Sequence, residues 1–194
     1  MIIISWNIRG LNSKGKQRYM KEKLKKDRPS IMILQETKIT MRQLEGIIKN
    51  SKLQYEVMGQ DAIGSAGGIA ILWNPNEIIF ESWTSMTRIL TGSGRIEGTK
   101  ERVTISGVYG PHTPGDRENF IKNLQATRRL HPKTAWIVGG DFNAIRSLKE
   151  KKGGTKKTDQ YMELFNDMIE GLRLVDISTI NGIYTWNNRR VGKS

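Results

Sequence analysis

Short runs of hydrophobic residues recur along the chain, and amphipathic stretches separate several of them. The runs have the length of buried strands, and they lie at residues 2–8, 30–34, 53–58, 68–73, 77–83, 102–109, 134–138 and 183–186. Hydrophobic residues at helical spacing occur at residues 16–26, 41–48, 114–124 and 158–172. This alternation predicts a mixed α/β domain, with antiparallel pairing among the consecutive strands in the middle of the chain.

Residues with side-chain oxygens stand where these helices should begin. Ser13 and Thr40 precede the first two helices and can cap them, and Thr158 opens the last helix. Thr113 and Pro114 combine a capping residue with a proline at the first helical position.

The chain is strongly basic. Its 194 residues suit one domain spanning residues 1–194, and 32 Lys and Arg against 19 Asp and Glu give a net charge of +13. That charge exceeds the magnitude of roughly 2–8 that solubility needs. Nucleic acid is therefore the favoured partner, ahead of an anionic membrane or a merely solubilising surface.

Features that the sequence does not contain exclude several kinds of site and partner. There is no Cys, which excludes disulfides, thiolate metal sites and cysteine nucleophiles. No hydrophobic run approaches the roughly 20 residues of a membrane helix, and the first residues show no secretory signal pattern. We therefore expect no membrane partner, and a monomer.

Polar motifs follow four of the predicted strands directly, where each hydrophobic run ends. They are Trp6-Asn7, Gln35-Glu36-Thr37, Tyr109-Gly110-Pro111 and Gly140-Asp141-Phe142-Asn143. Strand ends at one edge of a sheet can converge on a single cleft. Carboxylates and amides there would form an oxygen-rich pocket, which suits Mg²⁺ or Mn²⁺.

Each motif also has a plain structural interpretation. Asn7 could satisfy a turn, and Asp141 with Asn143 could form an Asx turn after a strand. Glu36 could pair with the lysine that follows two residues later, and Tyr109 could be a core aromatic residue. The four motifs together, in this order and in a basic chain, favour a catalytic site.

The segments SWNIRGLN, LQETK, VYGP and VGGDFN resemble the endonuclease/exonuclease/phosphatase superfamily. ISWNIRGLN, GSAGGIAILW, GGDFNAIR and the late YTWNN are similar to the endonuclease domain of plant non-LTR (LINE-type) retrotransposons. The resemblance implies a four-layer α/β sandwich, in which two mixed β-sheets are flanked by helices. It also implies a nuclease that nicks DNA, a reverse transcriptase as partner in the full element, and an intracellular, nuclear location.

The same resemblance implies roles by position. Glu36 would bind the divalent metal, Mg²⁺ or Mn²⁺, and Asn7 would help to hold the metal or the phosphate. Tyr109 would contact the scissile phosphate. Asp141 would orient or activate the attacking water, and Asn143 would hydrogen-bond the phosphate. These roles are chemically coherent, because hydrolysis builds negative charge that a metal and hydrogen-bond donors can stabilise.

The chain departs from the family pattern near residue 194. Relatives carry a Ser-Arg-x-Asp segment and a Ser-Asp-His segment downstream, and neither His112 nor His131 follows an aspartate here. We therefore expect a domain that is incomplete at the C-terminus, without its last strands, with an exposed sheet edge and weak or no nuclease activity. The alternatives are a non-catalytic nucleic-acid-binding remnant, and a phosphatase or phosphodiesterase that acts on inositol phosphates or phospholipids.

A basic loop follows the last polar motif. Its cations could hold a phosphate backbone without reading base sequence, and they are Arg146, Lys149, Lys151, Lys152, Lys156 and Lys157. Arg9 and Lys14 could act similarly, and His112 could line the cleft and touch phosphate. Alternatively, the loop is merely a solvated charged segment. Trp83 and Trp186 could stack on bases, although we expect both to pack in the core.

Overall fold

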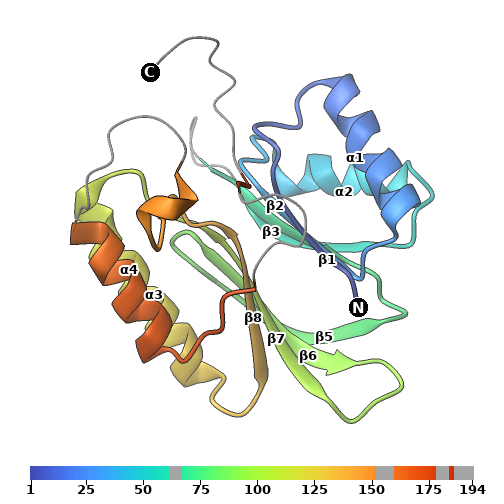
Figure 1. Cartoon of the computed structure of the whole chain (residues 1–194). Helices are drawn as coiled ribbons and strands as arrows, with labels where there is room; N and C mark the ends of the chain where they lie inside the picture. Colours follow the sequence, from blue (N-terminus) through green and yellow to red (C-terminus); the bar gives the residue numbers. More distant parts are fainter. Residues whose placement is uncertain (62–66, 152–159, 178–183, 186–194) are drawn as a thin grey trace.

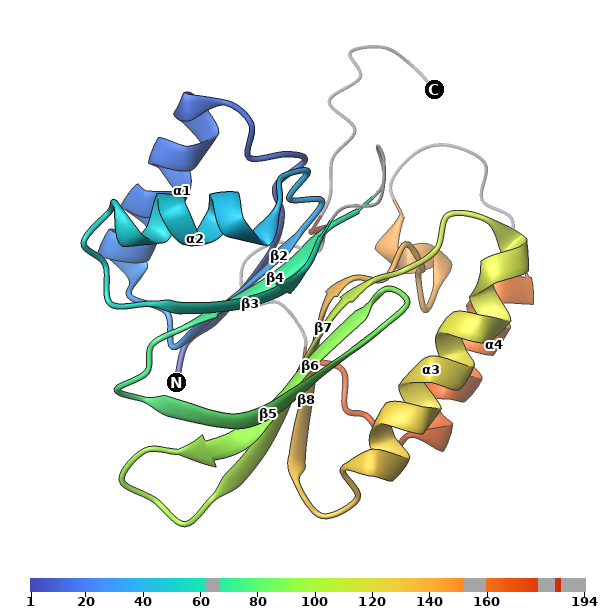
Figure 2. The same ribbon diagram turned by 180° about the vertical axis from the view of Figure 1, so that it is seen from behind.

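The computed structural model describes residues 1–61, 67–151, 160–177 and 184–185 (Figure 1). Two β-sheets pack face to face, and helices cover the outer face of each sheet (Figures 1 and 2). The order of layers is helices, sheet, sheet, helices. This arrangement confirms the predicted α/β sandwich of two mixed sheets flanked by helices.

The first sheet contains, among the described residues, four strands in the order β1-β2-β4-β3. Their bounds are Ile3–Asn7 for β1, Ile31–Gln35 for β2, Glu56–Gln60 for β3 and Ile69–Trp73 for β4. β1 and β2 are parallel, whereas β4 is antiparallel to both β2 and β3. Every residue of β2 and β4 is buried, because these inner strands are covered on both faces.

The second sheet, as far as the chain is described, has four strands in the order β5-β6-β7-β8. Their bounds are Ile78–Met86 for β5, Ile89–Ile96 for β6, Arg102–Tyr109 for β7 and Ala135–Asp141 for β8. β5, β6 and β7 form an antiparallel meander, and β8 lies parallel to β7. The predicted antiparallel pairing in the middle of the chain is confirmed.

Two helices cover each sheet. α1 (Lys14–Asp27) and α2 (Met41–Lys49) pack on the first sheet, and α3 (Arg117–Leu130) and α4 (Gln160–Gly171) pack on the second (Figure 2). The helical residues that are buried against the sheets are Met20, Leu24, Leu44, Ile48, Phe120, Leu124, Phe165 and Met168. As predicted, Ser13 caps α1 through its side chain, and Thr40 forms a capping box with Gln43.

A third hydrophobic cluster lies between the sheets and includes Ile33 of β2. Gly107 of β7 and Gly139 of β8 face this side chain. A Cβ atom on Gly107 would lie 2.7 Å from Cγ2 of Ile33, and one on Gly139 would lie 3.0 Å from its Cδ1. The two glycines therefore allow the sheets to approach closely, in an interior that is packed to near-crystalline density.

The parallel strand pairs bring polar residues from both sheets to one edge of the sandwich. Asn7 of β1 lies opposite Gln35 of β2, and Tyr109 of β7 lies opposite Asp141 of β8. β1 and β8 are neighbours across the two sheets. The strand ends that carry the polar motifs therefore meet, as the sequence predicts.

Several predicted boundaries are wrong. No strand is predicted for Ile89–Ile96, yet β6 is an inner strand of the second sheet. Its sequence is rich in Gly, Ser and Thr, so it lacks the hydrophobic pattern on which strand prediction depends. β5 extends beyond the predicted strand to Met86, and β3 begins at Glu56, later than predicted. β8 continues through both glycines to Asp141.

The start of α3 also differs from the prediction. Pro114–Asp116 forms a short 3-10 turn, and the α-helix begins only at Arg117. Thr113 makes no side-chain capping bond, and its hydroxyl donates to the Asp116 carboxylate at 2.7 Å.

The remaining predictions are either untested or wrong. The helix start at Thr158 and the packing of Trp186 lie outside the described residues. The predicted strand at residues 183–186 lies partly outside them, and its two described residues, Tyr184 and Thr185, are not in a strand. Trp83 is 55% exposed on the outer strand β5, so its predicted packing in the core is wrong. Within the described part of the chain, no helix is both long and apolar enough to cross a membrane.

Candidate active site

The side-chain amide of Asn7 joins two carboxylates that come from different sheets. Asn7 is the last residue of β1, and its Nδ2 atom donates hydrogen bonds to Glu36 Oε1 at 2.8 Å and to Asp141 Oδ2 at 2.9 Å. An amide nitrogen carries two hydrogens, so both are used. The main-chain N–H of Arg9 donates to Asn7 Oδ1 at 3.2 Å, which fixes the orientation of the amide.

Glu36 follows β2 and is held in its ionised form. Burial alone would raise the pKa of its carboxyl group, but the hydrogen bonds from Asn7 and Tyr109 and the positive charge of Lys38 lower the pKa below its usual value. The Lys38 ammonium lies 3.5 Å from Glu36 Oε2. The plain structural interpretation of the sequence expects this pair of Glu36 and Lys38. The pair coexists with the hydrogen bonds that Glu36 accepts from Asn7 and Tyr109.

Tyr109 ends β7, and its hydroxyl is part of a hydrogen-bonded chain. It donates to Glu36 Oε1 at 3.1 Å and lies 2.8 Å from Nε2 of His112. Burial, together with the negative charge of Glu36, raises the pKa of Tyr109 to about 12. Because the hydroxyl has a single proton and the carboxylate can only accept, His112 Nε2 is the donor to Tyr109 Oη.

Asp141 and Asn143 form an Asx turn directly after β8. The main-chain N–H of Asn143 donates to Asp141 Oδ1 at 3.1 Å. The Asn143 side chain donates to the carbonyl of Gly110 at 2.8 Å, and the Gly110 N–H donates to the carbonyl of Asp141 at 2.6 Å. The turn therefore ties the loops after β7 and β8 together. Asp141 Oδ2 still reaches Asn7.

Backbone strain is concentrated in the loops around this site. A positive φ is uncommon for a residue with a side chain. Eight non-glycine residues have one in the described chain, and five of these lie in the site loops, namely Arg9, Glu36, Lys38, Arg88 and Asn143. Such conformations persist only where the surroundings impose them, and they cluster at functional sites.

Lys16, in the first turn of α1, holds the loop that follows β1. Its Nζ atom donates to the carbonyls of Ile8 at 3.1 Å and Arg9 at 2.5 Å. The same loop pairs with the segment around Glu36, because the Gly10 N–H donates to the Glu36 carbonyl at 2.6 Å. Gly10 has φ +96°, which favours glycine there. Sequence reasoning missed Lys16, since nothing in its spacing shows that it reaches back to the loop.

Arg88 is a second residue that the sequence did not indicate. It occupies the turn between β5 and β6, and its carbonyl accepts from the Tyr109 N–H at 3.0 Å. Its guanidinium lies 5.9 Å from the centre of the Tyr109 ring and 3.4 Å from the Asp116 carboxylate. The missing prediction of β6 explains the omission, because the turn could not be placed without that strand.

The predicted phosphate-binding residues are distributed unevenly. Arg9, His112, Lys149 and Lys151 are exposed. Arg146 is engaged within the protein: its guanidinium donates to Asn166 Oδ1 at 3.0 Å and lies 3.5 Å from the Asp176 carboxylate. Lys152, Lys156 and Lys157 lie outside the described residues.

The site offers a divalent cation two carboxylates beside an amide. No group of three or more His, Asp and Glu side chains in the described residues forms a metal cage. Mg²⁺ is nevertheless commonly held by one or two carboxylates and keeps several waters. Glu36 and Asp141, bound by the same amide, provide such a set, so these residues fit a hydrated divalent ion.

The fold occurs in several solved structures. The chain is similar to the Xenopus laevis APE2 catalytic domain, with a TM-score of 0.66, 21% identity and coverage of 86% of this chain and 67% of that chain. It is also similar to the endonuclease domain of TRAS1, a telomere-specific non-LTR retrotransposon, with a TM-score of 0.66, 15% identity and coverage of 88% and 71%. The human nocturnin catalytic domain has a TM-score of 0.56 and 16% identity over 74% of this chain, which spans only 64% of that domain.

The sequence also matches a protein family over residues 4–192. Members of this family are hydrolases that act on phosphodiester bonds, and its nucleases generally use divalent metal ions. The sheets, the strand ends that meet at one edge, and this match over nearly the whole chain lead to one assignment. The chain belongs to the endonuclease/exonuclease/phosphatase family.

Proposed function

We propose that the chain is the endonuclease domain of a retrotransposon and hydrolyses phosphodiester bonds in DNA with the help of Mg²⁺ or Mn²⁺. The observation that carries this proposal is the Asn7 amide, which holds Glu36 and Asp141 together at 2.8 and 2.9 Å. Tyr109 adds a hydroxyl donor at the same carboxylate. Carboxylates beside fixed donors suit a reaction in which phosphate oxygens gain negative charge.

Each residue has a distinct task in this proposal. Glu36 would hold the cation with help from Asn7, and the cation would supply positive charge beside the phosphate. Tyr109 contacts the phosphate, and its hydroxyl must then turn its single hydrogen from Glu36 to a phosphate oxygen. Asp141 orients the attacking water, and Asn143 hydrogen-bonds the phosphate.

The choice of DNA rests on charge and similarity. A net charge of +13 favours a polyanionic substrate over a small phosphate ester. The similarity to the TRAS1 endonuclease domain supports a retrotransposon nuclease. In that case a reverse transcriptase would be the partner in the full element, and the nucleus would be the place of action.

Nicking of supercoiled plasmid tests the proposal. The wild-type chain should convert supercoiled plasmid slowly to the open-circular form with Mg²⁺, in keeping with the weak activity expected from the sequence, and not with EDTA. Glu36→Ala and Asp141→Ala should abolish nicking, whereas Glu170→Ala, which removes an exposed carboxylate from α4, should not. A folded wild-type chain that leaves the plasmid intact, or nicking that survives in both site variants, would rule the proposal out.

One observation favours a second candidate, nucleic-acid binding without hydrolysis. Within the described residues, neither His112 nor His131 hydrogen-bonds an aspartate, so no histidine is paired to act as a general base. A chain of this second kind would retain DNA in a salt-sensitive manner with EDTA or Mg²⁺ and would cleave none.

A further inference from the structure

Positive charge is distributed unequally between the two helical layers. α1 contains seven Lys and Arg against two Asp and Glu, and α2 contains two against one, so this layer has a net charge of +6. α3 contains four basic residues against one acidic residue, and α4 contains three acidic residues with no basic one. The helices on the second sheet therefore sum to zero.

Four cations of α1 form a continuous stripe along the helix. Lys14, Arg18, Lys21 and Lys25 recur at helical spacing, and each is exposed or half-exposed. Lys14, Lys21 and Lys25 form no ion pair with any described residue. Arg18 lies 3.8 Å from Glu22, but both side chains are largely exposed, so the pair neutralises little.

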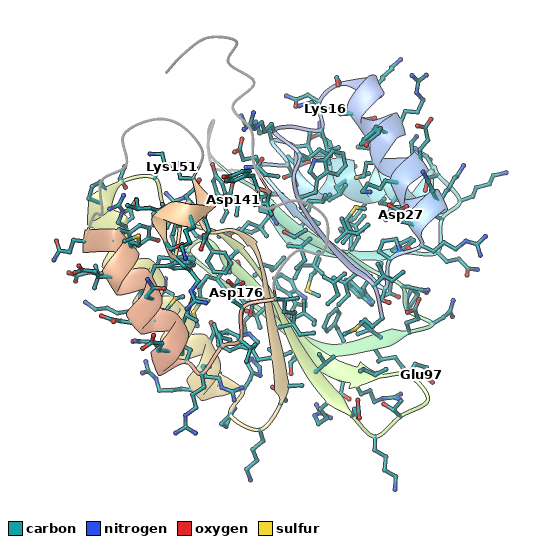
Figure 3. All side chains as sticks on the ribbon, in the orientation of Figure 1. Lys16, Asp27, Glu97, Asp141, Lys151 and Asp176 are labelled. Carbon is teal, nitrogen blue, oxygen red and sulfur yellow. The ribbon has the colours of Figure 1, made fainter. Side chains whose placement is uncertain are left out.

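The stripe begins at the end of α1 whose first turn contacts the loop that follows Asn7. Lys14 opens α1, and Lys16 in the same turn holds the carbonyl of Arg9, whose N–H fixes the Asn7 amide. Figure 3 shows Lys16 at the end of α1 nearer to Asp141, and Asp27 at the far end. Lys25 lies eleven positions after Lys14, a rise of roughly 16 Å along the helix.

We propose that this stripe binds the phosphate backbone of the DNA on one side of the cleavage site, an inference that rests on the proposed function. Over roughly 16 Å of duplex, one strand presents about five phosphates, which four cations at helical spacing can match. Such contacts carry no base sequence information, and they fix where the duplex lies. The neutral layer of α3 and α4 offers no comparable attraction, so the DNA extends asymmetrically from the site over α1.

Salt-dependent DNA binding tests the inference without requiring cleavage. Binding of a short fluorescein-labelled duplex would be measured by anisotropy in EDTA, between about 50 and 200 mM salt. The stripe variant carries Lys14→Gln, Arg18→Gln, Lys21→Gln and Lys25→Gln. The matched control removes four exposed cations elsewhere with Lys100→Gln, Lys122→Gln, Arg129→Gln and Lys133→Gln.

The slope of log K against log salt should become shallower by about 2–4 in the stripe variant, because each lost phosphate contact changes it by about 0.9. The control should change the slope by less than about 1. Equal slopes in the two variants, or a wild-type chain that does not bind duplex, would overturn the inference. The inference would also be overturned if the stripe variant bound duplex as the wild-type chain does and lost binding only to phosphatidylserine vesicles. If the fourfold variant does not fold, the pair Lys14→Gln and Arg18→Gln gives the same comparison at half the effect.

These outcomes are separate from those that judge the proposed function. A stripe-dependent slope with no Mg²⁺-dependent nicking by the wild-type chain would support the surface and count against the nuclease. Nicking with equal slopes in both variants would support the nuclease and count against the surface.

Discussion

Asn7 and Asp141 are 134 residues apart in the sequence, yet the amide of the first donates a 2.9 Å hydrogen bond to the carboxylate of the second. This bond crosses from the first sheet to the second at the edge where β1 and β8 are neighbours. The site is therefore shared between the sheets, and its geometry depends on how they pack.

Replacement of Asn7 should weaken both the fold and the candidate metal site. Asn7→Ala leaves two carboxylates facing each other without their common donor, which should lower the free energy of unfolding by about 1–3 kcal/mol. Asn7→Asp adds a third carboxylate and should be destabilised further in EDTA. Mg²⁺ should then raise the melting temperature of Asn7→Asp more than that of the wild-type chain. Equal Mg²⁺ responses in thermal melts would contradict this account.

The lowered pKa of Glu36 predicts how stability depends on pH. The folded pKa lies below the ordinary value of 4.5, so the stabilisation from the ionised carboxylate is fully present above about pH 4.5. It is lost as the pH falls through the lower folded value. The free energies of unfolding of the wild-type chain and Glu36→Gln, measured in urea, should therefore become equal in acid. Glu170→Gln is the control for the loss of one surface charge. A stability difference that stays constant down to pH 3 would show that the carboxylate is not held in this way.

Tyr109 and His112 should each leave a spectroscopic signature. With its pKa raised to about 12, Tyr109 should ionise later than an ordinary tyrosine in an ultraviolet titration, and Tyr109→Phe should remove that late step. The hydrogen-bond chain requires a proton on Nε2 of His112, which nitrogen NMR can detect. His112→Asn keeps a donor to the Tyr109 oxygen and should leave the ionisation of Tyr109 unchanged. His112→Phe removes this donor and should make Tyr109 ionise later still, because the donor stabilises the phenolate. Observation of the Nδ1–H tautomer in the free protein would contradict the chain.

Lys16 is expected to act as a positioning residue for Asn7. Lys16→Met removes the donor to the Ile8 and Arg9 carbonyls and should reduce nicking by on the order of 10-fold to 100-fold, because small displacements of site residues are costly. It should also raise the Mg²⁺ concentration needed to increase the melting temperature. Lys16→Arg should restore most of both properties, and Lys100→Met serves as the control. No rescue by arginine, with an unchanged Mg²⁺ response, would indicate a purely structural lysine.

Four residues of the candidate site could be predicted because each stands at or directly after the end of a hydrophobic strand. Asn7, Tyr109 and Asp141 are the last residues of β1, β7 and β8, and Glu36 directly follows β2. Parallel pairing places such ends together. The pattern therefore carried information about position as well as about chemistry.

The supporting residues could not be predicted in the same way. The Lys16 side chain contacts carbonyl groups seven and eight residues earlier in the chain. The sequence around Lys16 looks like that around any lysine of a basic helix. Arg88 depends on β6, whose Gly-rich sequence hides the strand. Arg146 looks like part of a basic loop, but Asn166 and Asp176, which lie at least 20 residues later, bind its guanidinium. Tertiary contacts of this kind leave no local pattern.

The close approach of Ile33 to Gly107 and Gly139 has a consequence for which substitutions this protein can tolerate. A methyl group at Gly107 would act as a wedge between the sheets and pull Asn7 away from Asp141, although it would lie in the interior and never meet DNA. The distance between the Asn7 amide and the Asp141 carboxylate therefore depends on buried glycines that carry no side chain. Substitution of a buried glycine would therefore disturb the candidate site without changing any of its side chains.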